Sequence, residues 1–219
     1  MRALRPADLA RLALGLALAA TALSAWVWKV GAPVSGDASL ARHVQSIEPL
    51  QRNAGWVNAA GDYAWWVLIV VAAWLALQPR LAKRREQRTQ AMRRAGLVGF
   101  AAAAVLGFGS AILKAIVDSP RPMEALGIHI QGSYSGNGFP SGHVYGDMLV
   151  YGVLAVFARG YLPRWAVLPV RALCIAVIVL AGAARVAVGA HWPSDTAGGY
   201  LWGGAALCLA LAVAKRWGK

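Results

Sequence analysis

Acidic residues and cysteines are scarce in this sequence. Its 219 residues include nine aspartates and glutamates and two cysteines, and charged residues make up only 14% of the chain. A soluble domain usually carries about a quarter charged residues, so this composition disfavours an ordinary soluble protein. Cys174 and Cys208 have no metal-site spacing and imply no disulfide framework. We therefore expect both cysteines to be packing residues.

Long hydrophobic runs take the place of the missing charge. Hydrophobic residues make up 58% of the chain, and six runs approach the ~20 residues that a helix needs to cross a bilayer. They cover residues 10–29, 63–79, 97–116, 143–160, 167–188 and 195–214. No water satisfies the backbone inside a bilayer, so each run must be helical. The sequence predicts an all-α integral membrane bundle of six transmembrane helices, forming one domain over residues 1–219.

Positive charge is distributed unevenly between the predicted loops. Seven of the 22 lysines and arginines lie within residues 80–94, and the net charge is +13. Nine more belong to the same side if the spans alternate: Arg2, Arg5, Arg11, Arg159, Arg164, Arg171, Lys215, Arg216 and Lys219. Only six remain for the other side. Because cationic loops stay in the cytoplasm, we expect both termini to be cytoplasmic, and we expect the basic loop to attract anionic lipid instead of nucleic acid.

The N-terminal run has a second interpretation. Its basic start, apolar centre and the small residues in "ATALSA" also fit a secretory signal peptide. We expect the run to be retained as a helix, because it is long and because Trp26 and Trp28 suit a membrane interface.

Residues 31–62 form a long loop on the predicted outer side. Within this loop Leu40, Val44, Ile47 and either Leu50 or Ala54 follow helical spacing. The spacing predicts a short helix on the outer surface, which either roofs an active site or only connects two spans.

Three of the six outer cations lie close to the ends of predicted spans. Lys114 stands at the outer end of the third span, Arg185 at the outer end of the fifth, and Arg121 follows in "DSPRPM". A charge at membrane depth is costly, about 2.5–3.5 kcal/mol at the centre on insertion scales. Snorkelling to the headgroups readily explains one such residue. Three at one level, with histidines beside them, indicate an anion bound between them.

Two of the four histidines reach the same level. His143 begins the fourth span and His191 lies between the fifth and sixth, whereas His43 and His129 have no partner pattern and are treated as bystanders. Asp147 lies four residues after His143 and so shares its helix face. It either bonds His143, pairs with another helix or faces a wet cavity, and we keep it outside the expected catalytic set.

The spacing of these residues forms three motifs. Lys114 is followed after six residues by Arg121 and Pro122, then come Pro140, Ser141, Gly142 and His143, and then Arg185, His191 and Asp195 with five and three residues between them. Together the motifs closely resemble the signature of the type-2 phosphatidic acid phosphatase superfamily, which contains membrane lipid phosphatases and vanadium haloperoxidases. The six spans favour the membrane branch over a soluble haloperoxidase. One departure is Ala184, where the family usually has a serine.

The resemblance implies that five residues bind phosphate. Lys114, Arg121 and Arg185 would hold its oxygens, because arginine offers a planar fork of donors and lysine a compact charge. Ser141 and the backbone N–H of Gly142 would add donors at a helix N-terminus, which is a ready anion site.

The resemblance also implies a catalytic role for three residues. His191 would be the nucleophile and form a phosphohistidine, and Asp195 would bind its other ring nitrogen. His143 would protonate the leaving oxygen and later activate water. The cations neutralise charge, and the carboxylate cluster typical of Mg²⁺ is missing from the set. We therefore expect no metal and no other cofactor.

These patterns predict a metal-independent phosphatase acting on a membrane lipid phosphate or diphosphate. Its place would be the cell (inner or plasma) membrane, with the active site facing the periplasm or cell exterior. Candidate substrates are undecaprenyl diphosphate, phosphatidylglycerophosphate and phosphatidic acid, and the expected partners are this lipid and the bilayer. A lipid phosphotransferase shares the chemistry and stays open as an alternative. A transporter is disfavoured, because the polar residues gather at one surface instead of the midplane. The sequence indicates no oligomeric state.

Overall fold

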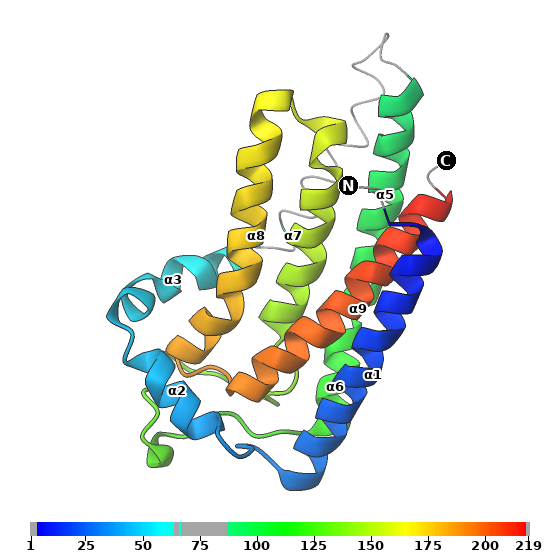
Figure 1. The fold of residues 1–219 in the computed structure, drawn as a ribbon. Helices are drawn as coiled ribbons and strands as arrows, with labels where there is room; N and C mark the ends of the chain where they lie inside the picture. The colour runs from blue at the N-terminus through cyan, green and yellow to red at the C-terminus, as the bar shows by residue number, and fades with distance from the viewer. Residues whose placement is uncertain (1–3, 64–65, 67–86, 218–219) are drawn as a thin grey trace.

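The computed structural model describes residues 4–63, 66 and 87–217, and within them the regular structure is entirely helical. The helices are α1 (Pro6–Val30), α2 (Asp37–Gln45), α3 (Glu48–Asp62), α5 (Gln87–Gly107), α6 (Gly109–Val117), the 3-10 turn η1 (Glu124–Leu126), α7 (Gly142–Tyr161), α8 (Arg164–Ala187) and α9 (Pro193–Trp217). The long helices lie side by side as a bundle, with α2 and α3 across one end (Figure 1). The all-helical class is as predicted.

Four stretches of the described chain are long and apolar enough to cross a membrane. They are Pro6–Val30, Arg93–Val117, Arg164–Ala187 and Pro193–Trp217, and each overlaps a predicted span. The predicted span 143–160 is also a helix, α7, but it is not among the four. The predicted span 63–79 lies almost entirely outside the described residues. The count of six spans therefore stays a prediction.

Helix α7 lies at the centre of the bundle. Leu149, Val150 and Val153 in its middle are fully buried, and the helix packs against α5, α8 and α9. Glycine allows a close approach between α7 and α9, since a Cβ on Gly203 of α9 would lie 3.0 Å from the carbonyl oxygen of Tyr145. Small residues at such crossings let helices pack closely inside a bilayer. The crossing fixes the first turn of α7 against the middle of α9.

The predicted span 97–116 is interrupted at Phe108, where α5 ends and α6 begins. Glycines flank the interruption on both sides. The hydroxyl of Tyr145 donates to the carbonyl of Leu106 at 2.7 Å, and it would come within 2.9 Å of a Cβ on Gly109. A side chain that inserts into the helical hydrogen-bond ladder is a usual cause of such a break.

The loop 31–62 contains two helices instead of the single short helix predicted. The buried carboxylate of Asp37 in α2 accepts from the backbone N–H and the hydroxyl of Ser194, at 2.9 and 2.7 Å. A carboxylate is stabilised at a helix N-terminus, so this contact ties α2 to the first turn of α9. The side chain of Gln45 donates to the carbonyls of His129 and Ala187, at 2.7 and 3.1 Å. Helix α2 is thereby fixed to the loop before α7 and to the end of α8.

The two ends of the bundle carry different parts of the chain. The start of α1 and the end of α9 lie at one end (Figure 1), where the Nζ atom of Lys215 donates to the carbonyl of Leu4 at 2.6 Å. Helices α2 and α3 lie at the other end, together with the connections 118–141 and 188–192. The predicted site residues lie at this second end.

Candidate active site

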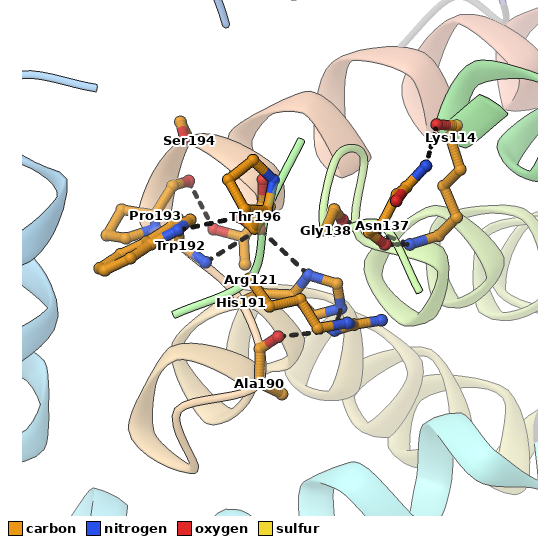
Figure 2. A network of polar contacts seen from close by, with 12 residues as sticks. Lys114, Arg121, Asn137, Gly138, Ala190, His191, Trp192, Pro193, Ser194 and Thr196 are labelled. Carbon is orange, nitrogen blue, oxygen red and sulfur yellow. Dashed lines mark hydrogen bonds and ion pairs between the residues drawn. The ribbon is translucent and has the colours of Figure 1, made fainter. Parts of the chain in front are cut away.

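The ends of four helices bring the predicted site residues together. Lys114 lies in the last turn of α6 and Arg185 in the last turn of α8. Ser141 is the N-cap of α7, and Asp195 lies in the first turn of α9. Arg121 reaches the same place from the loop between α6 and α7 (Figure 2). Residues spread over 82 positions of sequence thus meet because these helices end at one level.

His191 has a polar partner at each ring nitrogen. Its Nδ1 lies 3.3 Å from Oδ2 of Asp195, and its Nε2 lies 3.3 Å from Nη1 of Arg121. A guanidinium only donates, so Nε2 is the acceptor and the ring proton sits on Nδ1, facing the carboxylate. The same Oδ2 accepts the backbone N–H of Trp192 at 3.0 Å. This arrangement leaves the Nε2 lone pair directed at the cations.

Gly138 gives Asp195 the space that this pairing requires. A Cβ at Gly138 would lie 2.7 Å from Oδ2 of Asp195, which is closer than any side chain tolerates. The backbone N–H of Ser141 also donates to the carbonyl of Asp195 at 2.9 Å. The glycine-rich segment before α7 therefore packs directly on the histidine–aspartate pair.

Burial lowers the pKa of His191 well below its ordinary value of 6.5, and the positive charges of Arg121, Lys114 and Arg185 lower it further. The neutral imidazole, which is the nucleophilic form, therefore persists to lower pH than in an exposed histidine. Reactivity that depends on this ring is lost only as the pH falls through the lowered pKa.

We predict that the acid limb of kcat/KM that belongs to His191 has its midpoint below pH 6.5. The measurement is kcat/KM against pH for p-nitrophenyl phosphate, corrected for ionisation of the substrate phosphate, because kcat/KM reports groups of the free enzyme. A midpoint at or above 6.5 would contradict the electrostatic account.

The two arginines share one aromatic side chain. The guanidinium carbons of Arg121 and Arg185 lie 5.9 and 5.3 Å from the ring centre of Tyr134. Arg121 also donates to the carbonyl of Ala190 at 2.6 Å, as Figure 2 shows. Attraction to a ring face orients a guanidinium, so Tyr134 holds two like charges near each other. Nothing in the sequence pattern singled out Tyr134.

Lys114 and Ser141 complete the group of donors. The Nζ atom of Lys114 donates to the carbonyls of Asn137 and Gly138, at 2.6 and 3.3 Å. Among the described residues, the buried Oγ of Ser141 and Nε of Arg185 have no hydrogen-bond partner. Buried polar groups are rarely left unsatisfied, and two unpaired donors within this group of cations fit an anion. Gly142 begins α7 immediately after Ser141, so its N–H belongs to the first turn.

His143 pairs with a residue that the sequence did not indicate. Its Nε2 lies 2.6 Å from Oδ1 of Asp62, at the end of α3. Asp147, which the helix spacing offered as one partner, has a buried Oδ1 without any partner among the described residues. A Cβ on Gly61 would lie 2.9 Å from the ring of His143 and 3.1 Å from Asp147. The end of α3 therefore forms part of the site wall.

The departure at Ala184 falls in an apolar environment. Ala184 is fully buried and belongs to a small cluster with Ala54 of α3 and three other residues near the end of α8. The position that usually carries a serine in the family is thus packed against α3. Among the described residues, no group of three or more histidine, cysteine, aspartate or glutamate side chains gathers as a metal site would require.

Comparison with known proteins assigns this chain to a family. A sequence model described as the PAP2 superfamily matches residues 94–219, which is more than half of the chain and contains every predicted site residue. The chain belongs to the PAP2 superfamily. It is therefore a phosphatase and a multi-pass membrane protein. No match was found among curated proteins.

A solved PAP2 structure has the same fold. The crystal structure of a transmembrane PAP2-type phosphatidylglycerolphosphate phosphatase from Bacillus subtilis aligns with a TM-score of 0.71 at 22% sequence identity. The alignment covers 91% of this chain and 93% of that one. At this identity the likeness shows a shared membrane PAP2 fold.

Proposed function

We propose that this PAP2 protein hydrolyses the phosphate or diphosphate headgroup of a membrane lipid through a phosphohistidine intermediate at His191. The observation that carries the proposal is the orientation of that ring, whose Nδ1 faces Asp195 and whose Nε2 faces Arg121. A neutral nitrogen directed at a cluster of cations is arranged to attack a phosphorus atom whose oxygens the cations hold. All residues involved would belong to one domain over residues 1–219.

In the first step Nε2 of His191 attacks phosphorus, and the bond from phosphorus to the leaving oxygen breaks. His143 donates a proton to that oxygen, so the lipid leaves as an alcohol or a monophosphate. Asp195 stabilises the positive charge that the ring of His191 gains. In the second step His143 takes a proton from water, the resulting hydroxide attacks phosphorus, and His191 is released with inorganic phosphate.

Five donors would stabilise the transition state of both steps. Charge spreads over the equatorial oxygens of a transferred phosphoryl group, and catalysis is mainly positioning and electrostatic stabilisation. Lys114, Arg121 and Arg185 supply the positive charge, while Ser141 and the N–H of Gly142 supply neutral donors.

The proposed substrates are undecaprenyl diphosphate, phosphatidylglycerophosphate and phosphatidic acid. The Bacillus subtilis relative is named as a phosphatidylglycerolphosphate phosphatase, which supports keeping that lipid in the group. The test is release of inorganic phosphate by the purified protein from each lipid in detergent micelles. Repeating the assay with an acceptor lipid separates hydrolysis from phosphotransfer, because a transferase converts the acceptor and releases little free phosphate.

We predict that activity survives excess EDTA and is inhibited by vanadate. Three cations already neutralise the phosphate, so the chemistry proposed here needs no divalent ion. Vanadate adopts the trigonal-bipyramidal geometry of the transition state and can bond to Nε2 of His191. Phosphate release is measured with each addition. Loss of activity on chelation, restored by Mg²⁺, would contradict the mechanism.

We also propose that the site faces the periplasm or cell exterior and that both termini are cytoplasmic. The support is the charge pattern, since Arg5, Arg164 and Arg216 lie at the end of the bundle opposite the site and cationic ends stay in the cytoplasm.

The orientation predicts unequal labelling of two engineered cysteines. Ser39→Cys in α2 and Arg164→Cys at the start of α8 are both exposed positions, placed in a background whose two native cysteines are alanine. In intact cells an impermeant thiol reagent should label the first variant, and the second only after lysis. The reverse pattern would invert the orientation.

A further inference from the structure

A large apolar cavity lies beside the candidate site, and no role has been assigned to it. Its volume is about 630 Å³, and it is lined by α1, α5, α6 and α9 together with Tyr145 of α7. Cavities that bind small molecules usually have about 300–1,000 Å³. This cavity is therefore large enough to take part of a lipid.

Small side chains on three helices create the cavity. Ala10, Ala13 and Ala17 lie on one face of α1, opposite Ala205 of α9 and Gly109 of α6. Leucines at these positions would fill the space, as they do on other faces of the same helices. The cavity therefore results from small residues at positions where the apolar pattern alone would accept larger ones.

The lining offers nothing to a polar ligand. The hydroxyl of Tyr145 is used by the carbonyl of Leu106 at 2.7 Å, and the indole N–H of Trp202 donates to Oγ of Ser24 at 3.1 Å. The remaining lining side chains are hydrocarbon. The polar groups of a ligand would lose their water there without gaining hydrogen bonds, which costs free energy. The occupant must therefore be apolar.

The cavity opens to the outer face of the helices that cross the membrane. Leu14, Phe108 and Ile112 line it and are 62%, 75% and 62% exposed. In a bilayer these side chains face hydrocarbon. A lipid chain can therefore enter sideways without passing through water.

One end of the cavity adjoins the phosphate-binding residues. Leu113 lines it and directly precedes Lys114, and Tyr145 lies two residues after His143. Measured along the axis of α6, Gly109 and Lys114 are about 7.5 Å apart, given a rise of 1.5 Å per residue. A headgroup at Lys114 would therefore place the first carbons of its chain at the mouth of the cavity.

We propose that this cavity binds one hydrocarbon chain of the lipid phosphate substrate, which enters between α1 and α6. The proposal rests on the proposed function, since it assumes a lipid substrate whose phosphate is held at Lys114. It adds the route and the residues that recognise the chain. The cavity then selects substrates by the presence of a long apolar chain next to the headgroup.

The test fills the cavity and compares two substrates. Ala17→Phe places a ring in the cavity, whereas Ala19→Phe adds the same ring to an exposed position of α1 that is not part of the lining of this cavity. Each is assayed with dioleoyl and with dibutyryl phosphatidic acid. We expect Ala17→Phe to lower kcat/KM roughly tenfold for the long-chain lipid, because keeping about two methylenes out of the cavity loses that much binding. The kcat/KM for the short-chain lipid should stay unchanged. Ala19→Phe should change neither.

The outcomes separate this inference from the proposed function. If the wild type releases no phosphate from phosphatidic acid, from phosphatidylglycerophosphate or from undecaprenyl diphosphate, the proposed function fails. If the wild type is active and Ala17→Phe matches it on the long-chain lipid, the cavity holds only bulk lipid and the inference is wrong.

If Ala17→Phe loses both activities, crosslinking of the wild type decides. A lipid phosphonate with a mid-chain diazirine should label residues 10–17 or 105–113, and excess dioleoyl phosphatidic acid should compete. Equal labelling of the exposed face of α8, without competition, would overturn the proposal.

Discussion

Replacing His191 with alanine is expected to abolish phosphate release from every substrate. No phosphoenzyme can form without the nucleophile, so the leaving group should make no difference. Removing a covalent nucleophile typically lowers kcat on the order of 10⁶-fold. The side chain is buried and paired with Asp195, so folding of the variant should be checked by its thermal unfolding and its elution as a single species.

A second variant distinguishes loss of the nucleophile His191 from loss of the structure around it. Asp195→Asn keeps the size of the partner but removes its charge, and should leave His191 able to attack at a reduced rate. Residual activity in Asp195→Asn together with none in His191→Ala supports the assignment. Multiple turnovers by a folded His191→Ala protein would show that another residue is the nucleophile.

Replacing His143 with alanine should have an effect that depends on the leaving group. A lipid alkoxide needs a proton to depart, and general-acid assistance is typically worth about 10²–10⁴-fold. A nitrophenolate departs with little help. Phosphoenzyme formation should therefore slow by that factor with an alkyl monophosphate and change little with p-nitrophenyl phosphate. The formation step must be timed directly by rapid quench, because His143 also activates water in the second step.

Asp62 provides a sharper version of the same experiment. Its carboxylate is 2.6 Å from Nε2 of His143, and a carboxylate partner favours the protonated ring. Because the Asp62 side chain is 59% exposed, solvent screens the pair, and Asp62→Asn should slow alkyl phosphates by only about tenfold, with a shift of the alkaline limb to lower pH. Glu48→Gln, at the far end of α3, is the control and should change neither. Equal slowing of both leaving groups in His143→Ala would exclude His143 as the general acid.

The sequence predicted the membrane helices because hydropathy is a local property. Every end of helices α1, α8 and α9 lies within one to four residues of the end of a predicted run, since apolar runs of this length have few alternatives to a helix in lipid. The break at Phe108 was missed, because it depends on the hydroxyl of Tyr145, which is 39 positions from its acceptor Leu106. Helices α2 and α3 are short and are fixed by contacts such as that between Asp37 and Ser194, which no local pattern reveals.

The site was predictable to the extent that its residues form short motifs. Lys114, Ser141, Arg185 and His191 lie at helix ends that a span prediction already brings to one level. Asp62 and Tyr134 carry no motif, and they reach the site from segments whose path depends on tertiary contacts. Asp62 is separated from His143 by 81 positions. Such partners appear only once α3 is placed against α7 and α8.

The most direct test of the account is chemical trapping of the phosphoenzyme. Wild-type protein is mixed with a ³²P-labelled lipid phosphate, quenched within milliseconds under alkaline denaturing conditions, digested and mapped. We expect an acid-labile, base-stable label on the peptide that contains His191, which appears before inorganic phosphate and is missing from His191→Ala. Label on another residue, or phosphate release without any labelled protein in the first turnover, would contradict it.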